Sequence, residues 1–343
     1  MFNKSLRLSG ILGSCTILLF GLLGCTPTTP FNFVSTGGPI GYNIYGITKG
    51  PDGNLWFTEP NINGDKIGKI SPKNGKVTKY DIASNNSVGD GICIGPDGNI
   101  WFSDVNQIGK ISPKNGKITD YSVPDGDAND ITAGPDGNLW FTDGYMNRIG
   151  KISPVNGKVT EYLVPTKSAG PDSITAGPDG NLWFTEEEGD QIGKISPITD
   201  IITEYAIPSA YSDPCSITAG PDGNIWFTEH EGNKIGKIDP TTGVITEYSI
   251  PPSQNDTYVV DSITAGPDGN LWFVVCQGNV IDKISPDTGA IIEYPILSSD
   301  FGNILNEITE GRDGNLWFTF GGAHQIGKIS PSTGTVTDYQ VGD

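Results

Sequence analysis

The chain has 343 residues, and its 21 lysine and arginine side chains face 40 aspartate and glutamate side chains, for a formal net charge of −19. Such an acidic protein is a poor partner for nucleic acid and for anionic lipid headgroups, which repel negative charge. The five cysteines are scattered along the chain, so their spacing excludes a disulfide framework and a cysteine-based zinc site.

The first 24 residues have the pattern of a bacterial secretory signal. Lys4 and Arg7 precede an apolar run over residues 11–23, which is too short for a confident membrane span. The sequence LLGC at residues 22–25 then resembles a lipobox, at which the signal is removed and the cysteine is acylated. We therefore expect the mature chain to begin at lipidated Cys25, with residues 25–40 as a tether.

This interpretation predicts an extracytoplasmic lipoprotein that meets the membrane only through its lipid anchor. Thr26 follows the cysteine, and by the same resemblance this favours the outer membrane if the bacterium has two membranes. The alternative is an ordinary cleaved signal with an incidental cysteine at position 25.

One motif recurs seven times in the rest of the chain. It runs GPDGNLWFTE over residues 50–59 in the first copy and GRDGNLWFTF over residues 311–320 in the last. The motif contains all seven tryptophans, Trp56, Trp101, Trp140, Trp183, Trp226, Trp272 and Trp317. Their spacing of about 39–46 residues is typical of propeller blades. We predict that residues 41–343 form one all-β domain, a seven-bladed β-propeller with its tryptophans packed between blades.

Each repeat contains four short segments with the pattern of strands. In the first repeat these are residues 44–49, 54–59, 66–71 and 76–80, separated by Pro-Asp-Gly and Asn-Gly turns. The blades are therefore expected to be four-stranded and antiparallel. The Asp and Asn of each turn have the composition of a calcium loop, but their place in every hairpin favours a role in the turn itself.

The connections between blades differ most from repeat to repeat. Residues 81–89, 163–171 and 249–260 vary in length and sequence, whereas the turns on the opposite face are short and nearly constant. Variable loops on a rigid frame usually carry function. We therefore expect a small-molecule, peptide or protein ligand on the face formed by these connections, here called the link face, of a monomer.

The residue two positions before the isoleucine of each innermost strand points toward the central axis. Across the seven repeats this position holds Tyr45, Asp90, Asn129, Asp172, Cys215, Asp261 and Asn306. Carboxylates and carboxamides suit a hard cation such as Ca²⁺ or Mg²⁺. The candidate ligands are Asp90, Asn129, Asp172, Asp261 and Asn306. The alternative is a channel whose polar side chains bind only water.

Other reactive side chains have simpler interpretations. A second ring of residues ends the tryptophan-bearing strands, and because carboxylates occupy five of its seven positions a structural role is favoured: Glu59, Asp104, Asp143, Glu186, Glu229, Val275 and Phe320. His230 and His324 are expected to be solvated loop residues. Cys215 and Cys276 could form a disulfide, but buried thiols are favoured.

The repeat GPDGNLWFTE, followed by NKIGKI and ITEY, resembles the streptogramin B lyases, also called virginiamycin B lyases. The resemblance covers nearly all of residues 40–343. It implies a seven-bladed propeller that opens a cyclic depsipeptide antibiotic by Mg²⁺-assisted elimination at its ester bond, with a histidine as base.

Only some of the family's functional positions hold the expected residue in this chain. The substrate-facing tyrosine of blade one matches Tyr45. The histidines of blades six and seven fall on Asp261 and Asn306, and two metal-binding glutamates fall on Ile304 and Phe320. A carboxamide is no useful base near neutral pH, so no catalytic residue is assigned.

Two hypotheses about function follow. The preferred one is a surface-tethered binding module whose acidic channel mouth holds Ca²⁺, Mg²⁺ or a polar ligand. The alternative is a lyase, or a hydrolase like the metal-centred lactonase propellers, that acts on a cyclic ester such as a streptogramin B antibiotic.

Overall fold

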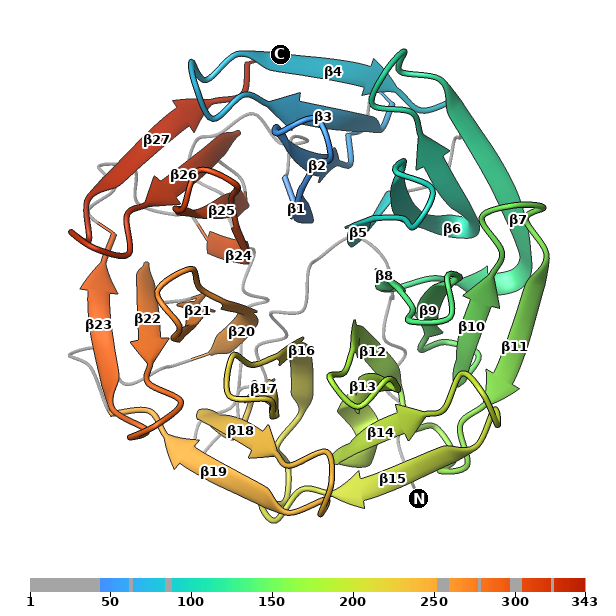
Figure 1. The fold of residues 1–343 in the computed structure, drawn as a ribbon, viewed down its shortest axis with the longest axis vertical. Helices are drawn as coiled ribbons and strands as arrows, with labels where there is room; N and C mark the ends of the chain where they lie inside the picture. Colours follow the sequence, from blue (N-terminus) through green and yellow to red (C-terminus); the bar gives the residue numbers. More distant parts are fainter. Residues whose placement is uncertain are drawn as a thin grey trace, which may run out of the picture.

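The computed structural model describes residues 44–61, 64–83, 88–251, 259–276, 279–296, 304–321 and 324–342. Seven sheets stand radially around a central axis, and chain order follows the circle from blue to red in Figure 1. The predicted seven-bladed, all-β propeller is confirmed. The predicted signal, Cys25 and the tether lie outside the described residues.

Each blade is built from consecutive antiparallel strands, with the first strand innermost. Blades one to four contain β1 (Ile47–Lys49), β2 (Leu55–Glu59), β3 (Lys66–Ile70), β4 (Val77–Asp81); β5 (Val88–Ile94), β6 (Ile100–Ile111), β7 (Ile118–Asp127); β8 (Ile131–Ala133), β9 (Leu139–Asp143), β10 (Arg148–Ile152), β11 (Val159–Leu163); β12 (Pro171–Ala176), β13 (Leu182–Glu186), β14 (Gln191–Ile195) and β15 (Ile202–Ala206). Blades five to seven contain β16 (Pro214–Ala219), β17 (Ile225–Glu229), β18 (Lys234–Ile238), β19 (Ile245–Ser249); β20 (Val260–Ala265), β21 (Leu271–Val275), β22 (Val280–Ile284), β23 (Ile291–Pro295); β24 (Ile304–Glu310), β25 (Leu316–Gly321), β26 (Gln325–Ile329) and β27 (Val336–Gln340).

Blade two departs from the pattern because its second and third strands are one element. The first half of β6 pairs with β5 and the second half with β7. Between the two halves Asn106 has a φ of 59°, the left-handed conformation that asparagine tolerates in a tight turn. The described residues contain one short 3-10 helix, η1 (Glu187–Gly189), and no helix among them is long and apolar enough to cross a membrane.

The Leu-Trp-Phe or Ile-Trp-Phe core of each second strand contributes to two interfaces at once. Leu55 and Phe57 pack with Trp317 of the preceding blade, whereas Trp56 packs with Ile92 of the following one. All seven tryptophans are fully buried, so their predicted place between blades is confirmed. This two-sided burial explains why the motif is apolar on both faces of the strand.

The aspartate of each Pro-Asp-Gly turn holds the tryptophan of its own repeat. Asp52 accepts a hydrogen bond from Trp56 Nε1 at 3.0 Å and also binds the backbone and side chain of Asn54. Tyr80 stacks on the same indole, with ring centroids 5.8 Å apart, and Lys69 lies over it. The same aspartate bond recurs in the other six repeats. The turn role predicted for these aspartates is confirmed.

The ring closes by packing the last sheet, β24–β27, against the first, β1–β4 (Figure 1). Thr319 Oγ1 donates to the carbonyl of Tyr45 at 2.8 Å, as Thr185 does to the carbonyl of Cys215 between blades four and five at 3.1 Å. Lys49 and Glu310 add an ion pair at 2.7 Å. Among the described residues, all strands of the first blade come from the start of the propeller sequence and all strands of the last blade come from its end. No blade combines strands from both ends within this part of the chain. The predicted contribution of residues 31–35 lies outside the described range.

Candidate functional site

Irregular pairing at the start of the innermost strands creates the channel mouth. The ladder between first and second strands shifts register before the conserved isoleucine in five blades, for example between Pro171 and Ile174 and between Val260 and Ile263. A bulge releases residues from the ladder and redirects their side chains. The two residues before each isoleucine are thereby available for interactions at the axis or with the neighbouring blade.

The seven ring positions identified from the sequence differ in exposure and partners. Asp90 and Asn129 are exposed, Cys215 is buried, and the other four are half-buried. Asn129 Nδ2 donates to Asp172 Oδ1 at 3.2 Å, which joins two of the predicted ligands across adjacent blades. Asn306 instead donates from Nδ2 to the carbonyl of Ile44 at 2.9 Å. Asn306 therefore contributes a link to blade one.

Two further acidic residues reach the same region, and the sequence analysis did not identify them. Asp130 and Glu307 stand one position before the isoleucine, where other blades have glycine or serine. Asp130 Oδ2 accepts from Ser173 Oγ and from the nitrogen of Ile174, each at 2.9 Å. The signal that could have found them is the change from a small residue to a carboxylate at this repeat position.

These carboxylates act on one another electrostatically. Burial and then repulsion from Asp130 raise the pKa of Asp90 to about 6. Part of the Asp90 side chain is exposed at the channel. The surrounding blades still enclose its carboxyl group enough to remove part of its hydration, which explains the raised pKa. Burial raises the pKa of Asp172, with added repulsion from Glu187, Asp130 and Asp90. The mouth thus brings together carboxyl groups whose ionisation is disfavoured by burial and by mutual repulsion.

The remaining acids of the mouth follow the same logic. Burial raises the pKa of Asp261 to about 7, although bonds from two thiols oppose this and repulsion from Asp90 adds to it. Burial also raises the pKa of Glu307, and Asp130 contributes repulsion. Acids that are costly to ionise without a positive partner fit a cation-binding role.

The positions at which the family resemblance expects magnesium ligands do not fit that metal. Phe320 is 2% exposed and packs edge-on against Phe318, with ring centroids 5.2 Å apart. Ile304 is an apolar side chain at the start of β24. Neither offers an oxygen ligand, so any cation at this mouth must use other residues.

The predicted solvation of the two histidines is wrong. His230 is 3% exposed, and its Nδ1 is 3.1 Å from the carbonyl oxygen of Val260, the first residue of β20. Burial lowers the pKa of His230. His324 is half-buried, with Nε2 3.7 Å from Glu59 Oε1 across the ring closure. Both histidines were expected to be solvated because they lie in loops, but their position in the sequence does not show how much of each side chain the surrounding structure covers.

Cys215 and Cys276 are buried thiols that do not form a disulfide with each other, as favoured from the sequence. Both lie beside Asp261, with Cys276 Sγ 3.5 Å from Oδ2 and Cys215 Sγ 3.9 Å from Oδ1. Cys215 Sγ is also 3.9 Å from His230 Nδ1. Burial raises the pKa of Cys215 well above its usual range, so the thiolate required of a nucleophile is disfavoured.

The second ring is fully buried at its five carboxylates. Glu59 Oε1 lies 3.0 Å from Lys79 Nζ, and Asp143 pairs with Arg148 at 2.7 Å. No such cation pairs with Glu186 among the described residues; burial, with repulsion from Glu204, raises its pKa to about 8. These groups face the interior of the blades, and we infer a structural role.

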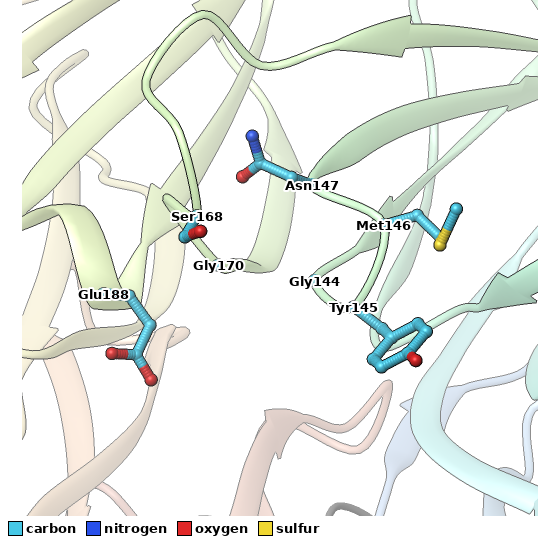
Figure 2. A pocket seen from close by; sticks show the side chains of 7 residues that line it. All are labelled: Gly144, Tyr145, Met146, Asn147, Ser168, Gly170 and Glu188. Atoms are coloured by element: carbon cyan, nitrogen blue, oxygen red, sulfur yellow. The ribbon is translucent and has the colours of Figure 1, made fainter. Parts of the chain in front are cut away.

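A pocket of about 520 Å³ opens on the link face between blades three and four. The turn after β9 and the connection before β12 line it, and in Figure 2 Tyr145 and Glu188 lie on opposite sides of the opening. Tyr145 is 77% exposed, so its ring is accessible at this opening. The pocket therefore combines an aromatic surface with a carboxylate.

Seven antiparallel sheets arranged around one axis place the chain in the class of seven-bladed β-propellers. Within this class, the virginiamycin B lyase family profile matches residues 38–131 and 125–343. The chain belongs to the virginiamycin B lyase family.

Solved structures agree with this assignment. A catalytically inactive histidine-to-alanine variant of virginiamycin B lyase from Staphylococcus aureus, with quinupristin, is 37% identical, with a TM-score of 0.76 over 84% of this chain and 95% of that one. A streptogramin B lyase is 36% identical, with a TM-score of 0.74 over 82% and 93% of the two chains. A search of curated proteins gave no significant match.

The fold extends to more distant proteins. The extracellular domain of a protein assigned as a one-component system from B. thetaiotaomicron is 14% identical, with a TM-score of 0.67 over 88% of this chain and 42% of that one. At this identity the likeness concerns the fold alone.

Proposed function

We propose that the mature protein is a surface-tethered binding propeller whose channel mouth holds Ca²⁺ or Mg²⁺ and whose link face binds a small molecule or peptide. The observation that carries the proposal is the convergence of Asp90, Asp172 and Asp261 with Asp130 and Glu307, whose pKa values are all raised. A divalent cation would replace their mutual repulsion by attraction.

The ligand surface is assigned to the link face next to this mouth. The pocket beside Tyr145 and Glu188 supports this assignment because it offers an aromatic ring and a carboxylate to a ligand with apolar and cationic or hydrogen-bonding parts. Lipid on Cys25 would place the propeller outside the cytoplasm, with residues 26–40 between lipid and domain.

The cation site is tested by titrating Ca²⁺ and Mg²⁺ into metal-free protein in a calorimeter. The parent should bind one of the two cations, and the Asp172→Asn/Asp261→Asn double variant should lose the heat of binding. Asp120→Asn serves as a control because Asp120 is an acid on the outer strand β7. Equal binding by parent and double variant would rule out this site.

A second candidate is cleavage of a cyclic ester, favoured by the 37% identity to a virginiamycin B lyase studied with quinupristin. The histidine-to-alanine variant of that protein is described as catalytically inactive. Here the resemblance places Asp261 and Asn306 at the family histidine positions. A binding role is therefore preferred to the family reaction.

A ring-opening assay separates the two candidates. Streptogramin B should remain cyclic with this protein and added Mg²⁺, under conditions in which the Staphylococcus aureus enzyme opens it. Robust ring opening that survives Asn306→Ala would favour a lyase with a different base.

A further inference from the structure

Three metal-ligating side chains of blade five meet on the link face outside the channel ring. Asp213 precedes β16, whereas His230 and Glu231 directly follow β17. One ligand atom from each residue lies within 4.8 Å of the other two. A backbone hydrogen bond from His230 N to Asp213 O, 3.1 Å long, joins the two segments. These three residues are here called the His230 cluster.

The orientation of His230 is that of a metal ligand. Its Nδ1 lies 3.1 Å from the carbonyl oxygen of Val260, and a carbonyl can only accept a hydrogen bond. Nδ1 therefore carries the hydrogen, and the lone pair is on Nε2. Metal-binding histidines almost always donate their other ring nitrogen to a carbonyl or carboxylate in this way. With only 3% of its surface exposed, the imidazole is also held by packing.

The connection that carries Asp213 is fixed by the neighbouring blade. Asp190 accepts hydrogen bonds from the backbone nitrogens of Tyr211, Ser212 and Asp213 at 2.9, 2.7 and 3.2 Å. Glu231, by contrast, is exposed and can change its rotamer. The cluster thus has a fixed imidazole, a carboxylate on a fixed backbone and a mobile carboxylate at the surface.

We propose that Asp213, His230 and Glu231 bind a divalent transition-metal ion of the Zn²⁺ type. Hard cations such as Ca²⁺ prefer oxygen ligands alone, whereas one imidazole with two carboxylates suits Zn²⁺. Ligand atoms around tetrahedral zinc are roughly 3.3–3.6 Å apart, given bonds of about 2.0–2.2 Å. Because Glu231 is exposed, its side chain can rotate to bring its carboxylate closer to the other two ligands.

Such a site would be independent of the cation site proposed at the channel. Its residues belong to the connection before blade five and to the turn between β17 and β18. Three protein ligands leave a fourth position for water or for a ligand bound on the link face. The cluster is therefore an additional point at which this face can hold a carboxylate or other metal-binding group.

The test is a competition titration of the metal-free, full-length protein against a chromophoric Zn²⁺ chelator. The parent should bind one Zn²⁺ per chain. Glu231→Gln and Asp213→Asn should each weaken binding by more than about 10-fold, because even groups that only orient a ligand contribute about 10–100-fold. His230→Gln should abolish binding, but this residue is buried, so the variants of exposed Glu231 and half-buried Asp213 are the decisive ones.

Two controls separate the cluster from other sites. His324→Gln removes the other histidine of the chain and should leave Zn²⁺ affinity unchanged. The Asp172→Asn/Asp261→Asn double variant should also retain Zn²⁺, even if it loses Ca²⁺ or Mg²⁺. Failure of the parent to bind Zn²⁺, or binding that is insensitive to both Glu231→Gln and Asp213→Asn, would overturn the proposal.

Discussion

The carboxylate of Glu307 in blade seven accepts a hydrogen bond from the backbone nitrogen of Ile47 in blade one, with Oε2 and N 2.8 Å apart. One side chain thus joins the last blade to the first and also brings an acid to the channel mouth. The carboxylate of Asp130 accepts the equivalent hydrogen bond from the nitrogen of Ile174. In the next-to-last blade the neutral hydroxyl of Ser262 accepts it from the nitrogen of Ile308. The acids of this position therefore combine a structural and an electrostatic role.

Glu307→Ala should destabilise the propeller by about 1–3 kcal/mol, because it leaves the nitrogen of Ile47 without its acceptor at the ring closure. Glu307→Gln is the matched control, since its amide oxygen can still accept the bond while the acid is lost. Denaturant unfolding should rank the parent and Glu307→Gln together and Glu307→Ala below them. Equal stability of all three would show that this bond does not hold the closure.

Trp183→Ala should cost on the order of 3–5 kcal/mol, the range for truncating a large buried aromatic side chain. Asp179→Ala keeps the indole but removes the acceptor of its Nε1–H, so it should cost only about 1–3 kcal/mol. Chemical denaturation of both variants measures the difference. A loss below about 1 kcal/mol for Trp183→Ala would contradict the packing of this residue between blades.

The repeat in the sequence was sufficient to predict the fold, because each blade needs the same turn and the same doubly buried second strand. The position of the channel mouth also followed from the repeat, since strand one lies innermost in every blade. Asp130 and Glu307 differ from the small residues of the other repeats at this position, but their partners, Ile174 and Ile47, are on other blades. The repeat pattern marks such a change without showing which neighbouring blade the carboxylate contacts. The burial of His230 was missed for a related reason, because it depends on contacts with Asp213 and Val260, which are distant from it in the sequence.

The free energy of unfolding should fall as pH rises between about 5 and 8. The native state keeps a proton on Glu186 up to its raised pKa, whereas the unfolded chain releases this proton near the ordinary glutamate pKa. The pKa of Glu186 is raised to about 8, so its contribution is complete below the unfolded value and is lost as pH passes the folded value. The resulting loss of stability is a few kcal/mol at most, because a pKa difference of one unit corresponds to about 1.4 kcal/mol. Urea midpoints of the parent at several pH values measure it.

Glu186→Gln should remove this part of the pH dependence and make the protein more stable than the parent above pH 8. Glu59→Gln is a control of opposite sign, because Glu59 is paired with Lys79 and its loss should destabilise at neutral pH. If Glu186→Gln shows the same pH profile as the parent, Glu186 is not the titrating group.

Cys25 is predicted to carry lipid. Cys25→Ser, or inhibition of the lipoprotein signal peptidase with globomycin, should leave unprocessed precursor and prevent partitioning into a detergent phase. Cys15→Ser is a suitable control because this cysteine lies within the predicted signal. Detergent partitioning that is unaffected by Cys25→Ser would rule out the anchor.

The most direct test of the cation-binding account is the melting temperature of the parent with chelator and with millimolar Ca²⁺ or Mg²⁺. A cation that binds only the folded ring stabilises it by about 2.7 kcal/mol at 100 times the dissociation constant. We expect the metal to raise the melting temperature of the parent and to have no effect on the Asp172→Asn/Asp261→Asn double variant. Because repulsion is also removed, that variant should melt above the metal-free parent. Identical melts of the parent with chelator and with either metal would contradict the account and leave a channel that holds only water.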